Sequence, residues 1–194
     1  MKRKNLDVFN RIAKKGVFPH EFAFTLLIPL RNVFISPKKL IHRLELRESY
    51  NVLEVGPGPG YFSLKVAEAI PYGKLILTDI QKEMLDITKR RLDRKKILNA
   101  EYHLCDGVRF PFESNKFNVI FMVTVLGEIE NKYEYINEFY RLLCVNGILS
   151  ISEQAGDPDK MSADEIKKLL HNSGFKLDKL YGTKNNFTIN FRKE

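Results

Sequence analysis

The segment VLEVGPGPGY, residues 52–61, joins a short apolar run to three glycines that alternate with prolines. The apolar run is typical of a buried strand, and the residues that follow Gly60 have the apolar spacing of a helix. Because glycine has no Cβ atom, Gly56, Gly58 and Gly60 permit a sharp turn and a close approach of the backbone to a ligand. The segment therefore predicts a ligand-binding loop at the carboxyl end of a sheet strand.

Strand and helix patterns alternate on both sides of this loop. Serine caps predict a helix from Ser36 to about Arg47 and another that begins after Ser162, where Glu165 completes a capping box. Two final segments of alternating polarity predict a terminal antiparallel hairpin, and the remaining alternation favours a parallel sheet with helices on both faces. The other strands are expected at 51–55, 75–79, 100–105, 117–125 and 148–152, the other helices at 62–70, 81–96 and 133–143, and the hairpin at 175–182 and 186–191.

The composition indicates one globular domain. The 194 residues are 44% hydrophobic and 29% charged, which excludes a disordered or low-complexity chain. Cys105 and Cys144 have no C-x-x-C spacing, so a disulfide framework and a cysteine zinc site are excluded, and a reducing, cytoplasmic location is expected. No apolar run reaches the roughly 18 residues of a membrane span, because Pro29 and Arg31 interrupt the nearest one. No metal site is predicted.

Asp79 points to the ligand class. It ends the second expected strand, 19 residues after Gly60, where a carboxylate can accept hydrogen bonds from both hydroxyls of a ribose. The dinucleotide fingerprint G-x-G-x-x-G requires glycine or alanine at position 61, which is Tyr61. The chain also lacks the G-x-x-x-x-G-K-[ST] element of an ATPase P-loop. These observations favour an adenosine ligand and disfavour NAD.

Together the motifs resemble those of class I S-adenosylmethionine-dependent methyltransferases, in the branch that includes ubiquinone and menaquinone biosynthesis methyltransferases. The similarity runs motif by motif over residues 50–153, through TDIQKEMLDITKR, Cys105-Asp106-Gly107 and RLLCVNGILSISE, and the hairpin extends it to the C-terminus. It departs at Val145-Asn146-Gly147, where the family often has Pro-Gly-Gly in a turn. The resemblance implies a Rossmann-like, doubly wound α/β fold with a mostly parallel seven-stranded sheet, and S-adenosyl-L-methionine as cofactor.

The resemblance also implies roles for individual residues. The methionine part and the sulfonium would contact Glu54, Gly56, Pro57, Gly58, Gly60 and Tyr61. The ribose and adenine would contact Asp79, Ile80, Asp106, Gly107 and Val108, and the pocket floor would be closed by Val123 and Thr124. Each role has a structural alternative, such as a tight turn for the glycines, a helix cap for Asp79 or core packing for Tyr61.

No catalytic side chain stands out. In-line methyl transfer needs aligned reactants in a site with little water, and it does not strictly need an acid or a base. Glu128 and Glu153, at the ends of the fourth and fifth strands, are candidates for orienting or deprotonating the acceptor. His20 is a candidate that would approach from the N-terminal region. The alternatives are a helix-start residue for Glu128 and a structural histidine for His20.

The N-terminal region is expected to determine the acceptor. Residues 1–48 contain 11 Lys and Arg against 4 Asp and Glu, most of the net charge of +8, together with several phenylalanines and leucines. We expect them to form a helical cover over an S-adenosylmethionine-binding domain of residues 49–194. The missing Asn-Pro-Pro-Tyr element in TVLGEIE, residues 124–130, favours a small or lipid-like acceptor over nucleic acid, with contact to a membrane surface in keeping with the cover. An RNA or protein acceptor and a non-catalytic binding module stay open as alternatives.

Overall fold

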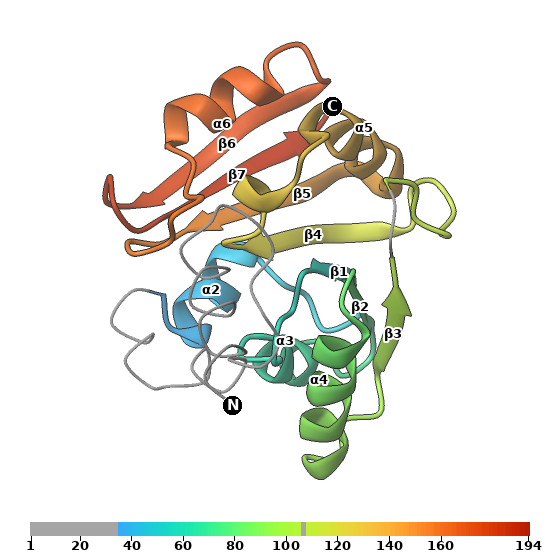
Figure 1. Cartoon of the computed structure of the whole chain (residues 1–194). Helices are drawn as coiled ribbons and strands as arrows, with labels where there is room; N and C mark the ends of the chain where they lie inside the picture. Colours follow the sequence, from blue (N-terminus) through green and yellow to red (C-terminus); the bar gives the residue numbers. More distant parts are fainter. Residues whose placement is uncertain (1–34, 106–107) are drawn as a thin grey trace.

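The computed structural model describes residues 35–105 and 108–194, which are organised around one seven-stranded sheet (Figure 1). Its strands are β1 (Asn51–Val55), β2 (Lys74–Asp79), β3 (Ala100–Leu104), β4 (Phe117–Val123), β5 (Leu143–Glu153), β6 (Phe175–Gly182) and β7 (Phe187–Lys193). Their order across the sheet is β3-β2-β1-β4-β5-β7-β6. Strands β1 to β5 pair in parallel, and β7 is antiparallel to both of its neighbours. The predicted Rossmann-like, mostly parallel α/β sheet is confirmed.

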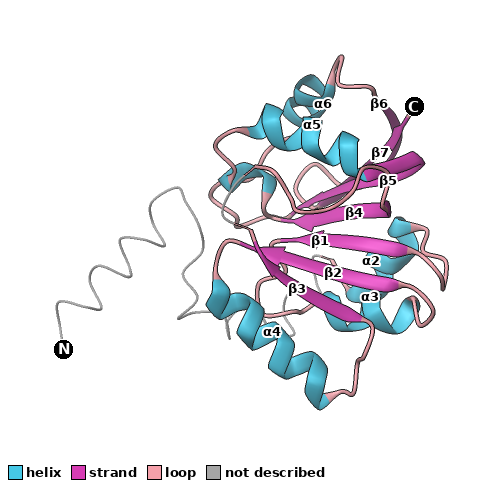
Figure 2. Cartoon of the chain, turned by 90° about the vertical axis from the view of Figure 1, so that its right-hand side faces the viewer, coloured by secondary structure: helices cyan, strands magenta, loops and turns pink. Residues whose placement is uncertain are grey.

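Helices cover both faces of the sheet (Figure 2). One face carries α2 (Pro37–Leu44), α3 (Ser63–Ala69) and α4 (Lys82–Arg94), and the other carries α5 (Lys132–Leu142) and α6 (Ala163–Leu170). Successive strand residues point to opposite faces. Accordingly Val52 packs in the core of the first face, whereas its neighbour Leu53 packs in the core of the second.

Helix starts follow the predicted caps. Lys39 N–H donates to Ser36 Oγ (3.3 Å) at the start of α2, and the capping box of α6 is present, with Glu165 N–H donating to Ser162 Oγ (3.2 Å). The end of α2 differs from the expectation by three residues, because Glu45 takes a left-handed conformation (φ 50°) at the C-cap. The Glu45 carboxylate then accepts a hydrogen bond from Arg192 Nη2 (2.6 Å) of β7.

Strand β5 begins five residues earlier than expected, at Leu143. Val145-Asn146-Gly147, expected as a turn, lies inside this strand as an irregularity. The pairing with β4 jumps from Phe117–Leu143 to Val119–Ile148, and Asn146 has a left-handed φ of 63°. The extra residues are accommodated as a bulge in the strand and do not form a loop between α5 and β5.

Helix α2 is packed onto the sheet. Leu40 and Leu44 are buried in the same core as α3 and α4, and Asn190 Nδ2 of β7 donates to the carbonyl oxygen of Arg43 (2.7 Å). Residues 1–34, which make up most of the expected N-terminal cover, lie outside the described residues, so the division of the chain at residue 48 stays a prediction. No helix in the described ranges is both long enough and apolar enough to span a bilayer.

The chain order creates a switch point in the sheet. From β1 the chain moves outward to β2 and β3, and it then returns to place β4 on the other side of β1. The last residues of β1 pair with those of β4, with Val55 opposite Met122. In open α/β sheets ligands bind outside the carboxyl ends of the strands at such a point. The loop that follows Val55 is the predicted glycine loop.

Candidate active site

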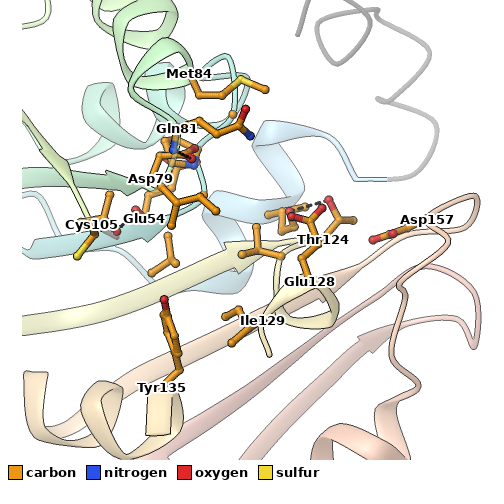
Figure 3. A pocket seen from close by; sticks show the side chains of 18 of the residues that line it. Glu54, Asp79, Gln81, Met84, Cys105, Thr124, Glu128, Ile129, Tyr135 and Asp157 are labelled. Atoms are coloured by element: carbon orange, nitrogen blue, oxygen red, sulfur yellow. Dashed lines mark hydrogen bonds between the residues drawn. The ribbon is translucent and has the colours of Figure 1, made fainter. Parts of the chain in front are cut away.

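A cavity of about 720 Å³ lies at the carboxyl ends of β1, β2, β4 and β5 (Figure 3). This volume is within the range of small-molecule and cofactor sites. One end is formed by the glycine loop and the ends of β2 and β3. The other is formed by the 3₁₀ helix η3 (Leu126–Glu128), the start of α5 and the loop that follows β5. The cavity therefore joins the expected cofactor site to a second compartment.

The glycine loop is held by contacts with β2 and α4. Gly56 N–H donates to the carbonyl oxygen of Thr78 (2.8 Å), and Gly56, Gly58 and Gly60 all have left-handed φ values of 65°, 55° and 74°. A Cβ atom on Gly60 would lie 2.7 Å from Cγ2 of Thr88, so any side chain at this position would require Thr88 or the loop to shift. Thr88 Oγ1 also donates to the carbonyl oxygen of Gly58 (2.6 Å). Helix α4 thus holds the loop in shape.

Glu54 and Asp79 place two carboxyl groups beside this loop. Glu54 is buried, and burial raises its pKa to about 8, with repulsion from Asp79 adding to the effect and Ser63 opposing it. Its Oε2 atom has no hydrogen-bond partner among the described residues. Burial also raises the pKa of Asp79 to about 6, although its Oδ1 accepts a hydrogen bond from Gln81 N–H (2.9 Å). Both groups line the cavity and have capacity for ligand hydrogen bonds.

Apolar side chains surround the position beyond Asp79. The predicted residues Ile80 and Val108 line the cavity there, and the sequence had not indicated Met84 or Cys105, which line it as well. Cys105 forms no disulfide. Asp106 and Gly107, the expected adenine contacts, lie outside the described residues. A flat apolar ring such as adenine fits the composition of this wall.

Val123 and Thr124, which were expected to close the floor of the pocket, both line the cavity at the end of β4. Thr124 has a left-handed φ of 55°, which is uncommon for a β-branched residue. Its N–H donates to the carbonyl oxygen of Ser152 (2.8 Å), and its hydroxyl donates to the carbonyl oxygen of Val123 (2.7 Å). Strain held in this way by surrounding structure is found preferentially at functional sites.

Glu128 lies in the second compartment. It ends η3 and lines the cavity together with Ile129 and Tyr135. Burial raises its pKa to about 8, and repulsion from Asp157, Asp159 and Asp79 adds to the shift. A carboxyl group with such a pKa can accept a proton near neutral pH. The structure therefore brings this predicted candidate to the cavity.

Two other expected residues do not line the cavity. Glu153 is fully buried in β5 and lies behind the wall, and its neighbour Gln154 lines the cavity in its place, because successive strand residues alternate in direction. Gly60 also lies outside the lining and serves to pack the loop against α4. Of the other expected contacts, Pro57 and Tyr61 line the cavity, and His20 lies outside the described residues.

Most of the chain matches a known protein family. Residues 46–186 match a family model described as a methyltransferase domain. The chain belongs to the methyltransferase domain family. Among solved structures, a SAM dependent methyltransferase from Aquifex aeolicus has the same fold, with a TM-score of 0.86, 21% identity, and coverage of 92% of this chain and 100% of that one.

Two curated relatives of this methyltransferase domain differ in the reaction they are named for. Malonyl-[acyl-carrier protein] O-methyltransferase 1 of Ilyobacter polytropus is 29% identical over 120 residues, covering 59% of this chain and 44% of that protein. Ubiquinone/menaquinone biosynthesis C-methyltransferase UbiE of Pseudomonas entomophila is 29% identical over 118 residues, covering 60% and 46%. The chain thus spans about half the length of the curated relatives it matches.

Several residues that line the cavity or hold its glycine loop were not found from the sequence. Thr88 belongs to the apolar stripe of α4, and the only signal was a hydroxyl among apolar neighbours. Tyr135 of α5 was marked in the sequence only in the same way, by a hydroxyl group next to apolar residues of the helix. The loop of residues 154–158 gave no signal, because its place in the wall depends on where β5 ends.

Proposed function

We propose that this methyltransferase domain binds S-adenosyl-L-methionine and transfers its methyl group to a small or lipid-like acceptor. The observation that carries the proposal is one continuous cavity that joins the glycine loop and Asp79 to the compartment at Glu128. Such a cavity places a donor and an acceptor side by side. Alignment of this kind contributes on the order of 7–11 kcal/mol to a displacement reaction.

The residues present suit this cofactor. The unpartnered Oε2 of buried Glu54 calls for a donor such as an ammonium group. The Asp79 carboxylate already accepts hydrogen bonds from the backbone N–H groups of Gln81, Gly58 and Ile80, and we assign its remaining acceptor capacity to a ribose hydroxyl. The left-handed glycines remove side chains where the ligand would approach the backbone. When bound, the cofactor supplies a methyl group attached to a positively charged sulfur. Val123, Val125 and Ile129 give the neighbouring compartment an apolar wall, which suits a reaction that is favoured by a site with little water.

Glu128 is the group that we assign to the acceptor. With its pKa raised to about 8, Glu128 is largely protonated at pH 7, and its carboxylate form, which becomes more populated as the pH rises towards 8, is the proton acceptor for a nucleophile held in the second compartment. The cover expected from residues 1–48 is retained as part of the proposal, with its apolar side chains closing over a lipid-like acceptor. A cytoplasmic location is also retained, and it is supported by the two cysteines, which form no disulfide.

The first test is calorimetry with S-adenosylhomocysteine. Because a hydrogen bond to a charged group contributes about 1.5–3 kcal/mol, Asp79→Asn is expected to weaken binding roughly 10- to 100-fold. Asp86→Asn is the matched control, since Asp86 pairs with Lys82 on the exposed side of α4 (2.6 Å) and should bind like the wild type. Equal affinities for the two variants would remove Asp79 from the site.

The alternatives from the sequence are separated by two measurements. An RNA acceptor predicts tight binding that weakens steeply with salt, because phosphate contacts release counterions. A non-catalytic module predicts cofactor binding with no labelled product after incubation with methyl-labelled cofactor and cell extract. The proposed enzyme predicts a labelled small molecule or lipid in the same extract.

A further inference from the structure

Gln154 is a buried polar side chain that lines the cavity and has no role in the function proposed above. It is 4% exposed, and its Nε2 has no hydrogen-bond partner among the described residues. Such groups are uncommon in folded proteins, because burial of an amide N–H that makes no hydrogen bond costs free energy. The NH₂ group of a glutamine is a donor only. The group that would complete this site is therefore a hydrogen-bond acceptor that the described part of the chain does not supply.

The backbone on both sides of Gln154 is held in place. Thr124 N–H donates to the carbonyl oxygen of Ser152 (2.8 Å), two residues before it. Ala155 N–H, one residue after it, donates to Asn186 Oδ1 (2.9 Å) in the turn between β6 and β7. The position of the side chain is thus fixed through its backbone, and its Nε2 is left unpaired.

The end of β5 lies beside the segment that contacts the glycine loop. Val123 of β4 pairs with Ser152 of β5, and Val125 and Gln154 each follow this pair by two residues. Both of them line the cavity. The side chain of Val125 fills the space in front of Gly56, since a Cβ atom on that glycine would lie 2.6 Å from Val125 Cγ2. A ligand held by Gln154 would therefore be close to the loop where we place the methyl donor.

The acceptor compartment also has an apolar, partly aromatic wall. Phe110, Ile129 and Tyr135 line it. The Tyr135 ring makes edge contacts with Phe110 and Phe139, with centroid distances of 6.0 and 5.9 Å. Ile129 and Tyr135 lie together on one side of the cavity (Figure 3). A wall of this kind suits the apolar body of a small molecule whose polar group is held elsewhere.

The charge of the lining decides between a neutral and an anionic oxygen. Within residues 35–105 and 108–194, no lysine, arginine or histidine lines the cavity. The amide of Gln154 carries no charge, so a carboxylate or phosphate held by it would be buried without a cation. A carbonyl or hydroxyl oxygen needs an N–H donor and no counter-ion. The lining therefore favours an uncharged oxygen.

We propose that Gln154 determines acceptor specificity: its Nε2 donates a hydrogen bond to an uncharged carbonyl or hydroxyl oxygen of a methyl acceptor that has an apolar body. This inference rests on the proposed methyltransferase function. The oxygen lies at the end of β5, and the apolar body lies against Ile129 and Tyr135. The site selects against hydrocarbons, because a ligand without the oxygen leaves a buried donor unpaired, and against anions, which find no cation.

Glutamine-selective ¹⁵N labelling tests this contact, because Gln81 and Gln154 are the only glutamines in the chain. Acetophenone or ethylbenzene is added to the full chain saturated with S-adenosylhomocysteine; the two probes share a phenyl ring and differ in the carbonyl oxygen. Acetophenone is expected to move the side-chain N–H signal of Gln154 downfield, and ethylbenzene to leave it in place. The variant Gln154→Met assigns the signal by its loss. A signal that responds equally to both probes, or to neither at millimolar concentration, overturns the inference.

The affinities of the probes give a second measurement. Gln154→Met keeps an unbranched side chain of similar length and removes the donor. It is expected to bind acetophenone roughly 3- to 10-fold more weakly, with the affinity for ethylbenzene unchanged or higher. Benzoate should bind more weakly than acetophenone to the wild type. Lys168→Met, at an exposed position of α6, is the control and should keep the wild-type affinities. An equal change for both neutral probes in Gln154→Met contradicts the hydrogen bond.

The stability of the ligand-free chain separates a ligand contact from a structural role. Gln154→Met replaces an unpartnered buried amide by an apolar group, so its Tm is expected to equal or exceed that of the wild type. A Tm well below those of the wild type and Lys168→Met would show that the amide has a partner within the fold, and it would overturn the inference.

Binding of S-adenosylhomocysteine is measured first in the wild type and in the variant, which separates the two proposals. A wild-type chain that fails to bind it contradicts the proposed function. If the wild type binds it and Gln154→Met does not, Gln154 is a cofactor contact, and the acceptor assignment alone is wrong. Equal binding by both chains, with a selective loss of acetophenone in the variant, supports the inference.

Discussion

Glu153 is a fully buried carboxyl group at the end of β5, opposite Phe187 of β7. Burial raises its pKa to about 8, and repulsion from Asp157 contributes. Between its ordinary pKa of 4.5 and this value, the folded chain keeps a proton that the unfolded chain releases. The unfolded state therefore binds fewer protons, and the contribution of Glu153 to stability decreases as the pH rises from about 4.5 to 8.

The variant Glu153→Gln removes this dependence. Between pH 5 and pH 8, the unfolding free energy of the variant is expected to rise by at least about 1 kcal/mol relative to that of the wild type. This corresponds to a relative increase in Tm of roughly 2–4 °C. Thermal unfolding of the ligand-free chain at both pH values measures it. Glu68→Gln on the surface of α3 should show the wild-type profile, and parallel profiles for Glu153→Gln and wild type would contradict the assignment.

At the residue scale, the sequence predicted the positions that a motif marks. Glu54, Asp79 and the glycine loop follow from one strand-to-helix junction and one spacing. Gln154 could not be predicted, because which of two neighbours faces the cavity depends on the register of β5 with β7. A shift by one residue would exchange Glu153 and Gln154.

At the element scale, the contact between α4 and the glycine loop connects the helix to the cofactor site. Thr88 touches the loop at two places, by its hydroxyl at Gly58 and by its methyl group next to Gly60. Helix α4 was predicted from its apolar stripe, and so was β1. Their contact was not, because it depends on how the two elements pack.

We expect Gly60→Ala to destabilise the fold more than Gly156→Ala. Both glycines have left-handed φ values, 74° and 88°, so each variant carries the backbone cost of about 1–2 kcal/mol. Only the Gly60 variant also places a Cβ atom 2.7 Å from Thr88, whereas Gly156 has no atom within 4 Å of that position. Urea unfolding measures the difference, and equal losses of stability would show that the contact with α4 yields easily.

Also at this scale, β5 shows why boundaries are harder to predict than elements. Asn146 and Gly147 have turn composition, which favoured a loop. The neighbouring strand β4 nevertheless continues the pairing to Leu143 and accommodates the additional residues as a bulge. The tertiary context thus overrides the local preference.

At the scale of the whole molecule, the site joins the two halves of the sheet. Its lining comes from the ends of β1, β2 and β3, where we propose that the cofactor binds, and from the ends of β4 and β5, where we propose that the acceptor binds. A ligand that contacts both halves stabilises the folded chain only, and the gain in free energy follows from its concentration and its Kd.

Saturation with S-adenosylhomocysteine at 100 times its Kd is therefore expected to add about 2.7 kcal/mol of stability. For a chain of this size the gain corresponds to a rise in Tm of roughly 5–10 °C. NAD at the same concentration serves as the control and should leave the Tm unchanged, since Tyr61 replaces the third glycine of its fingerprint. A rise with NAD and none with S-adenosylhomocysteine would contradict the cofactor assignment.

The place of β7 between β5 and β6 has a consequence for synthesis on the ribosome. Strand β6 precedes β7 in the chain, yet it reaches the sheet only through β7. Until β7 emerges, β5 presents a bare edge of amide and carbonyl groups to other nascent chains. Translation that stalls between residues 182 and 187 is expected to yield a product prone to aggregate through that edge.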